Sequence, residues 1–245
     1  MYKLYLSTML LLVLSVASAN AEERFLSDVV KTSSGDLKIT FIGHASLIFS
    51  FNNKTFHVDP FSKLADYALL PKADVILITH AHGDHLDPAA IGKVRTEKTK
   101  IVLTGIAAKQ LQGGIIMNNN DVQIVEGVKI EAVPAYNIVH KRDTGEFFHP
   151  KGAGNGYILT FGDKRVYVAG DTENIPEMAG LKNIDIAFLP MNLPYTMTPE
   201  MTAAAAKMIQ PKILYPYHTG STDTSLLTTL LKDQKGIEVR IRKME

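Results

Sequence analysis

Short apolar runs separated by polar turns recur along most of the chain and predict many strands with a few helices between them. Several runs are rich in β-branched residues, which is typical of strands covered on both faces. The turn pairs Asn52-Asn53 and Gly162-Asp163 lie between neighbouring runs and predict β-hairpins. The predicted strands cover residues 37–42, 46–51, 55–58, 75–79, 101–104, 128–133, 156–161, 165–169, 184–189, 213–217 and 237–241.

Four segments have the pattern of helices, at residues 88–94, 106–112, 199–209 and 225–233. The third is the clearest, because Thr198 suits the N-cap, Pro199 suits the first helical position and the alanines at 203–206 have high helix propensity. Helices interleaved with strands predict an α/β fold in which helices pack on sheets. The chain shows no internal repeat and no second-domain boundary, so we expect one domain over residues 22–245.

The first 21 residues have the pattern of a secretory signal peptide. Lys3 precedes an apolar stretch at 4–17, and small residues at 17, 19 and 21 offer cleavage after Ala19 or Ala21. The stretch is short for a membrane span, although an uncleaved anchor is the alternative. We therefore expect an exported protein, periplasmic or secreted, that has no stable membrane insertion after cleavage. No cysteine follows the stretch, which excludes a lipoprotein anchor.

The charge balance and the cysteine content restrict which partners and which metal-ligand atoms are possible. The chain has 26 lysine and arginine residues and 25 aspartate and glutamate residues, and removing the signal segment takes away one base, Lys3, and no acid. A neutral chain without a basic run argues against nucleic acid and favours a small-molecule substrate. The chain has no cysteine, so any metal ion must be held by nitrogen and oxygen atoms. The sequence leaves the oligomeric state open.

Histidines and aspartates crowd together where the predicted strand at 75–79 ends. His80 and His82 are two positions apart, so in an extended segment they project to the same side. A turn at Gly83 then brings Asp84 and His85 back toward them. A single histidine at a strand end is usually just hydrogen-bonded, but this density of neutral imidazoles and carboxylates is typical of a site for zinc or a related divalent ion.

The motif His80-x-His82-x-Asp84-His85 resembles the signature of the metallo-β-lactamase fold superfamily of metal-dependent hydrolases. Downstream, residues 169–172 resemble the segment that supplies a bridging aspartate, here Asp171, and residues 215–218 resemble the segment that supplies the last histidine, His218. Upstream, residues 41–46 and 57–60 resemble the branch that contains L-ascorbate-6-phosphate lactonase. The resemblance runs from residue 37 to the end of the chain and implies a four-layer αββα sandwich.

The chain departs from the superfamily pattern at the third histidine of the first metal position. Asn137 stands where many relatives carry a strand-end histidine, and asparagine is a poor zinc ligand. His140 and His149 follow within reach. His149 is the preferred candidate, because its surroundings resemble a pattern of the lactonase-like branch. Whether His149 ligates a metal or contacts substrate stays open, as does the occupation of a single site.

The resemblance implies a dinuclear centre. His80, His82 and a residue of the 137–149 loop would hold one ion, while Asp84, His85 and His218 would hold the other and Asp171 would bridge them. Two divalent ions can turn a shared water into a hydroxide nucleophile at neutral pH. Asp84 would orient that hydroxide as a catalytic residue. Zinc is the default metal for nitrogen-rich ligation, and the aspartates leave manganese or iron open.

Other residues are candidates for supporting roles. The family places an aspartate at the position of Asp59, below the metal cluster, where it would orient a ligand histidine. His44 follows Gly43 on a predicted loop and would contact the metal site or the substrate, unless it is an ordinary loop residue. Tyr136 and Tyr195 are candidates to line the pocket.

The function predicted from these observations is hydrolysis of a small ester, lactone or phosphodiester by an exported metal-dependent enzyme. A β-lactamase is the first alternative, and it fits an exported location. A ribonuclease is disfavoured by the export signal and the neutral charge. The alternative of another class is a non-catalytic metal- or ligand-binding module on the same scaffold, with Asn137 marking a degraded site.

Overall fold

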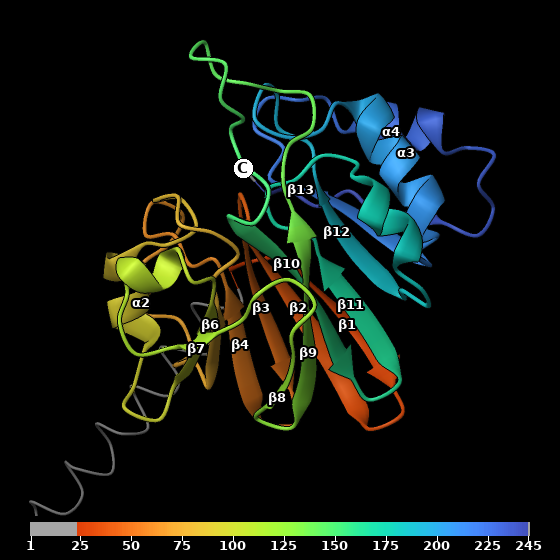
Figure 1. Ribbon diagram of the computed structural model, residues 1–245. Helices are drawn as coiled ribbons and strands as arrows, with labels where there is room; N and C mark the ends of the chain where they lie inside the picture. The colour runs from red at the N-terminus through yellow and green to blue at the C-terminus, as the bar shows by residue number, and fades with distance from the viewer. Residues whose placement is uncertain (1–23, 245) are drawn as a thin grey trace, which may run out of the picture.

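The computed structural model describes residues 24–244 and contains two seven-stranded sheets that face each other (Figure 1). The first sheet contains, in spatial order, β1 (Ser27–Thr32), β2 (Gly35–Gly43), β3 (Ser46–Phe51), β4 (Lys54–Val58), β5 (Val75–Leu77), β6 (Lys100–Leu103) and β7 (Ile115–Ile116). The second contains β14 (Glu238–Val239), β13 (Ile213–Tyr217), β12 (Ile186–Pro190), β11 (Lys164–Val168), β10 (Gly154–Phe161), β9 (Val128–Ala135) and β8 (Val122–Val125). The predicted signal segment lies outside the described residues.

The layers follow from apolar residues on both faces of each sheet. The central core lies between the sheets and includes Phe41, Phe49, Phe161 and Phe188. The outer face of the first sheet packs against α2 (Pro88–Val94). The outer face of the second packs against α3 (Pro199–Ile209), α4 (Ser225–Leu230) and the 3-10 helix η2 (Pro176–Gly180). The predicted αββα sandwich is therefore confirmed.

Strand β5 shows how alternation builds the layers. Val75 and Leu77 point into the core between the sheets, while Ile76 contributes to the core under α2. All three residues are fully buried, as expected for a central strand with parallel neighbours on both sides. The loop that follows this strand is therefore anchored to a rigid element that is buried away from water.

The predicted hairpins and two of the predicted helices are confirmed. Strands β3 and β4 pair across Asn52-Asn53, both of which have positive φ, and β10 and β11 pair across Gly162-Asp163. The helices α2 and α3 have the predicted bounds, and the N-cap Thr198 accepts a hydrogen bond from the backbone N–H of Met201. No helix within residues 24–244 is long and apolar enough to cross a membrane.

The predicted helix at 106–112 is wrong. Only one 3-10 turn forms there, η1 (Ala107–Lys109), and Ala107 is its one buried residue. Burial of so little apolar surface does not offset the entropic cost of starting a longer helix. The helix α4 also ends at Leu230, three residues before the predicted end.

Strands β1, β7 and β8 are absent from the prediction. Each lies at a sheet edge, and their exposed apolar residues include Val29, Ile116 and Ile124. Edge strands bury only part of their surface, so their sequences lack the continuous apolar run that marks a central strand.

Candidate metal centre

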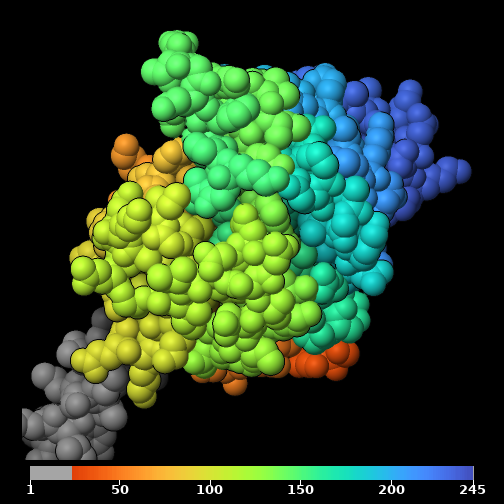
Figure 2. All heavy atoms as spheres, viewed as in Figure 1, coloured from red at the N-terminus to blue at the C-terminus, as the bar shows by residue number. Residues whose placement is uncertain are grey.

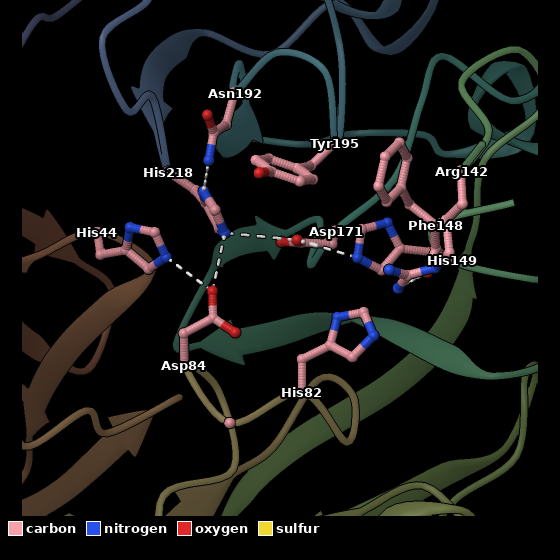
Figure 3. Close-up of a pocket in the computed structure, with 11 residues that line it drawn as sticks. His44, His82, Asp84, Arg142, Phe148, His149, Asp171, Asn192, Tyr195 and His218 are labelled. Atoms are coloured by element: carbon pink, nitrogen blue, oxygen red, sulfur yellow. Dashed lines mark hydrogen bonds and ion pairs between the residues drawn. The ribbon is translucent and has the colours of Figure 1, made fainter.

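The candidate ligands gather at one edge of the sandwich because several strands end there. His44 follows β2, Asp59 follows β4, Asp171 lies beyond β11 and His218 follows β13. The segment with His80, His82, Asp84 and His85 continues from β5. Figure 3 shows five of these side chains, His44, His82, Asp84, Asp171 and His218, converging on one cavity. Residues distant in the sequence thus meet because strands of both sheets end at this edge.

Three histidines form the first potential ligand group. Nitrogen atoms of His80, His82 and His149 lie within 4.8 Å of one another. Nε2 of His80 is 2.9 Å from Nδ1 of His82. His149 enters from the loop before β10, whereas His140 belongs to none of the potential metal groups in residues 24–244. Of the two alternatives for the third histidine, the structure brings His149 to the cluster.

The second potential group contains His44, Asp84, His85 and His218, again within 4.8 Å. His44 joins it through Nε2, which lies 3.0 Å from Oδ2 of Asp84. The sequence analysis expected His44 to contact the metal site or the substrate, and the structure places it beside the expected ligands of the second group.

Asp171 lies between the two groups. Its Oδ2 is 3.2 Å from Nε2 of His149, a member of the first group. The same oxygen is 3.4 Å from Nε2 of His218, and Oδ1 is 3.5 Å from Nε2 of His85, both in the second group. The carboxylate therefore lies within reach of ligand candidates from both groups.

Three buried polar atoms at this point have no hydrogen-bond partner among the described residues. They are Nε2 of His85, Nε2 of His218 and Oδ1 of Asp171. Buried polar atoms are rarely left unsatisfied, and lone pairs that converge in one place are what a bound cation requires. With nitrogen and carboxylate donors only, the residues present fit zinc or a related divalent ion.

Asp59 fixes the orientation of His85. Nδ1 of His85 is 2.8 Å from Oδ2 of Asp59, and the carboxylate also accepts hydrogen bonds from the backbone N–H and the hydroxyl of Thr79. Because Nδ1–H of His85 donates a hydrogen bond to Asp59, His85 presents the Nε2 lone pair to the centre. Asp59 has φ 43°, a costly conformation for a non-glycine residue that is typical of functional sites.

Asn137 fixes the orientation of His149 in the same way. Its Oδ1 lies 2.6 Å from Nδ1 of His149 and accepts a second hydrogen bond from the backbone N–H of that residue. Its Nδ2 donates to Oε1 of Glu173 and to the backbone oxygen of Tyr195. Asparagine at this position therefore positions the histidine that points into the centre.

Glu173 is a residue that sequence reasoning missed. Its buried carboxylate accepts hydrogen bonds from Nδ2 of Asn137 and from three consecutive backbone N–H groups, those of Ile138, Val139 and His140. Nδ1 of His140 lies 2.7 Å from the same carboxylate. Its position two residues after Asp171, at a strand end, was the one available signal. Glu173 holds the start of the loop that delivers His149.

Asn192 is the second residue that was missed, because Asn-Leu-Pro is an ordinary turn sequence. Its side-chain amide lies 3.1 Å from Nδ1 of His218 (Figure 3). The ring of His218 also contacts the ring of His44 in a tilted arrangement, with ring centroids 3.8 Å apart. Of the two candidate tyrosines, Tyr195 lines the cavity, whereas Tyr136 donates its hydroxyl to Glu177.

The electrostatics of the cluster favour a cation. Burial lowers the pKa of both His80 and His82, so each stays neutral and keeps a lone pair. Burial acts in the same direction on His85, but the carboxylates of Asp171 and Asp59 outweigh it and raise the pKa of His85 to about 9. The carboxylates thus concentrate negative charge where the unpartnered atoms meet.

Comparison with known proteins agrees with this geometry. The family model of the β-lactamase superfamily domain matches residues 38–218. The chain belongs to the β-lactamase superfamily. A UPF0173 metal-dependent hydrolase of Methanopyrus kandleri is 31% identical over 197 residues, which cover 76% of this chain and 85% of the relative. The relatives and the His/Asp cluster together identify this chain as a metal-dependent hydrolase.

Solved structures agree on the fold of this hydrolase. A protein of Parabacteroides distasonis whose name assigns it to the metal-dependent hydrolases is 53% identical, with a TM-score of 0.86 over 90% of this chain and 100% of that one. A metallo hydrolase of Ignicoccus hospitalis is 24% identical, with a TM-score of 0.70 over 85% of this chain and 95% of its own. The latter likeness shows the fold alone.

Proposed function

We propose that this hydrolase is an exported, dinuclear enzyme that cleaves a small ester, lactone or phosphodiester. The observation that carries the proposal is the convergence of buried atoms of His85, His218 and Asp171 that have no hydrogen bond from the described residues, between two groups of potential ligands. His80, His82 and His149 would hold one ion, and Asp84, His85 and His218 would hold the other, with Asp171 between them. Bound divalent ions would supply an acidified water and stabilise charge that develops on oxygen.

The residues of the chain then divide the remaining tasks. Asp59 and Asn137 hold His85 and His149 with Nε2 facing the centre. Nε2–H of His44 donates to Oδ2 of Asp84, and Oδ1 of Asp84 has no hydrogen bond from the described residues. Asp84 lines the open cavity, so Oδ1 is placed to accept a hydrogen bond from the attacking water and to orient it.

The lactonase-like branch, suggested by the motifs at residues 41–46 and 57–60, supports lactone or phosphoester substrates. The experiment is elemental analysis of metal per chain on tag-free mature protein, followed by a panel of esters, lactones, phosphodiesters and nitrocefin. Two metal equivalents with turnover of a panel member are the expected result. One equivalent would contradict the dinuclear centre, and no metal after reloading with zinc or manganese would contradict the proposed function.

Export is supported by the signal-peptide pattern of residues 1–21 and by the absence of cysteine from the chain. Expression of the full chain in a Gram-negative host, followed by osmotic-shock release and intact-mass measurement, tests it. The expected product is a periplasmic chain that begins at Asn20 or Glu22. A full-length chain that stays in the cytoplasm would contradict export.

A further inference from the structure

The cavity in front of the metal centre is lined by one described side chain with a permanent positive charge. The cavity measures about 470 Å³, and Arg142 is the only lysine or arginine among its described lining residues. Arg142 lies on a hairpin at residues 138–148, the green segment that projects at the top of Figures 1 and 2. Figure 3 shows its side chain beside Phe148 and His149 at the rim. The chain therefore places a permanent positive charge at the mouth of the active site.

No carboxylate among residues 24–244 forms an ion pair with Arg142, although Asp143 and Glu146 belong to the same hairpin. The guanidinium instead lies over the ring of Phe148, with 5.0 Å between Cζ and the ring centroid. Phe148 in turn contacts Tyr195 edge to face, with ring centroids 5.1 Å apart. Nη2 of Arg142 also donates a long hydrogen bond, 3.5 Å, to the backbone oxygen of Phe148. The other N–H groups of the guanidinium stay available for an anion.

The backbone of the hairpin holds Arg142 in place. The N–H of Arg142 donates to the oxygen of Glu146, and the N–H of Gly145 donates to the oxygen of Arg142. Lys141 and Phe147 form an antiparallel bridge one step further down, and Glu173 fixes the base of the loop. A fixed backbone lowers the entropic cost of recruiting this side chain for binding.

The two cavities beside the centre differ in charge. A smaller cavity of about 210 Å³ shares His82, Phe148, His149 and Asp171 with the larger one. Its remaining described lining residues include Ile106 but no lysine or arginine. A substrate that occupies both cavities would therefore have its charged part in the larger one and an uncharged part in the smaller one.

We propose that Arg142 binds an anionic group of the substrate that is not cleaved, a carboxylate or a phosphate. The substrate class is then an ester or lactone that carries a second, anionic group. The inference rests on the proposed function only in that the bound anion belongs to a substrate. The planar guanidinium can bind either oxyanion through two parallel hydrogen bonds, so the shared chemistry is a bidentate oxyanion.

Calorimetric titration of the zinc-loaded protein tests this without turnover. Butyrate, with one carboxylate, is compared with the dicarboxylates succinate, glutarate and adipate, and with 3-phosphonopropionate. In the wild type, at least one two-anion probe should bind about tenfold more tightly than butyrate, since one charge-assisted interaction is worth about that factor. Tighter binding of the phosphonate than of every dicarboxylate would identify a phosphate, and the reverse order would identify a carboxylate.

Arg142→Gln should reduce that preference to about one, and Arg142→Lys should retain part of it. The matched control is Lys141→Gln, since Lys141 has the same charge on the same hairpin but lines neither cavity and lies over the ring of Phe147. It should keep the wild-type preference. A wild type without any preference for two-anion probes, or a preference that survives in Arg142→Gln, would overturn the inference.

Hydrolysis separates this inference from the proposed function. If the panel yields a substrate, Arg142→Gln should raise KM for its anionic form with kcat retained, and leave a neutral analogue unchanged. If no substrate is cleaved while the binding preference depends on Arg142, the hydrolytic function fails and the anion site stands. If substrates are cleaved without any dependence on Arg142, this inference fails alone.

Discussion

Two histidines of the centre, His85 and His149, are held by the same contact from acceptors of different charge. Nδ1 of His85 faces the carboxylate of Asp59 at 2.8 Å, and Nδ1 of His149 faces the amide oxygen of Asn137 at 2.6 Å. Both acceptors are buried, and each accepts a further backbone hydrogen bond. The two histidines are therefore oriented in the same way. A negatively charged group lies behind His85, whereas a neutral group lies behind His149.

The difference shows where the chain places its negative charge. A carboxylate behind a histidine makes the imidazole a more basic ligand, whereas an amide only directs it. Behind Asn137 lies Glu173, with 2.9 Å between Nδ2 and Oε1. On the side of His149, the negative charge thus lies on Glu173, one residue further from the metal centre than Asn137. There it accepts hydrogen bonds from the backbone N–H groups of the loop. An aspartate at 137 would face Glu173 directly.

Asp171→Ala removes the carboxylate that both halves share, and it should have the largest effect. We expect hydrolysis to fall by more than about 100-fold, because even residues that merely orient ligands contribute 10- to 100-fold. Metal content should fall with it while the circular dichroism spectrum is retained. Asp143→Ala, on the exposed hairpin, is the control and should behave as the wild type. Near-normal turnover of Asp171→Ala would contradict the mechanism.

Asp59→Asn tests the charged half. The amide can still accept from Nδ1 of His85, but it cannot accept every hydrogen bond that the carboxylate receives from Thr79 and His85. We expect metal affinity of one site to fall about 10- to 100-fold and unfolding to become easier by about 1–3 kcal/mol. Competition with a fluorescent chelator and urea unfolding measure the two effects. Unchanged metal affinity would show that charge behind His85 is unimportant.

Asn137→Ala tests the neutral half and should have a smaller effect, about tenfold in the affinity of one metal site, since only orientation is lost. Asn137→Asp is the sharper comparison. We expect it to bind metal no more tightly than Asn137→Ala, because the new carboxylate is repelled by Glu173. The same chelator competition measures both variants. Tighter binding by Asn137→Asp than by the wild type would contradict this account of the amide.

A carboxylate away from the centre should affect stability alone, and its contribution should change with pH only in acid. Burial raises the pKa of Asp28, but hydrogen bonds from Arg242 and Tyr215 outweigh burial and lower it below the ordinary value of 3.8. The folded state then binds fewer protons than the unfolded state, so this stabilisation is complete above pH ~4 and is lost as the pH falls through the lowered pKa.

Asp28→Asn should therefore show a shallower loss of unfolding free energy below pH ~4 than the wild type, with metal content and turnover unchanged at neutral pH. Urea unfolding of both proteins across that range measures the difference in slope. Equal slopes would contradict the role assigned to the Asp28–Arg242 pair, and altered metal content would show that this carboxylate acts on the centre as well.

The central strands, the two hairpin turns and the helices α2 and α3 were predictable from sequence, because buried strands, tight turns and capped helices leave local patterns. The helix predicted at 106–112 does not form beyond one 3-10 turn. Its local helix propensity is not sufficient, because the fold buries so little of this segment. The edge strands β1, β7 and β8 were missed for a related reason. Their pairing depends on the neighbouring strand more than on their own residues.

The sequence by itself determined the chemistry of the cluster, since the three histidines and the one aspartate at 80–85 lie within one short stretch whose spacing restricts how they can point. The resemblance to metal-dependent hydrolases added Asp171 and His218. Only the tertiary structure decided between His140 and His149, and it gave Asn137, Glu173, Asn192 and Arg142 their places. Those contacts join strand ends and loops far apart in the chain, and long-range hydrogen bonds leave no periodic trace in a sequence.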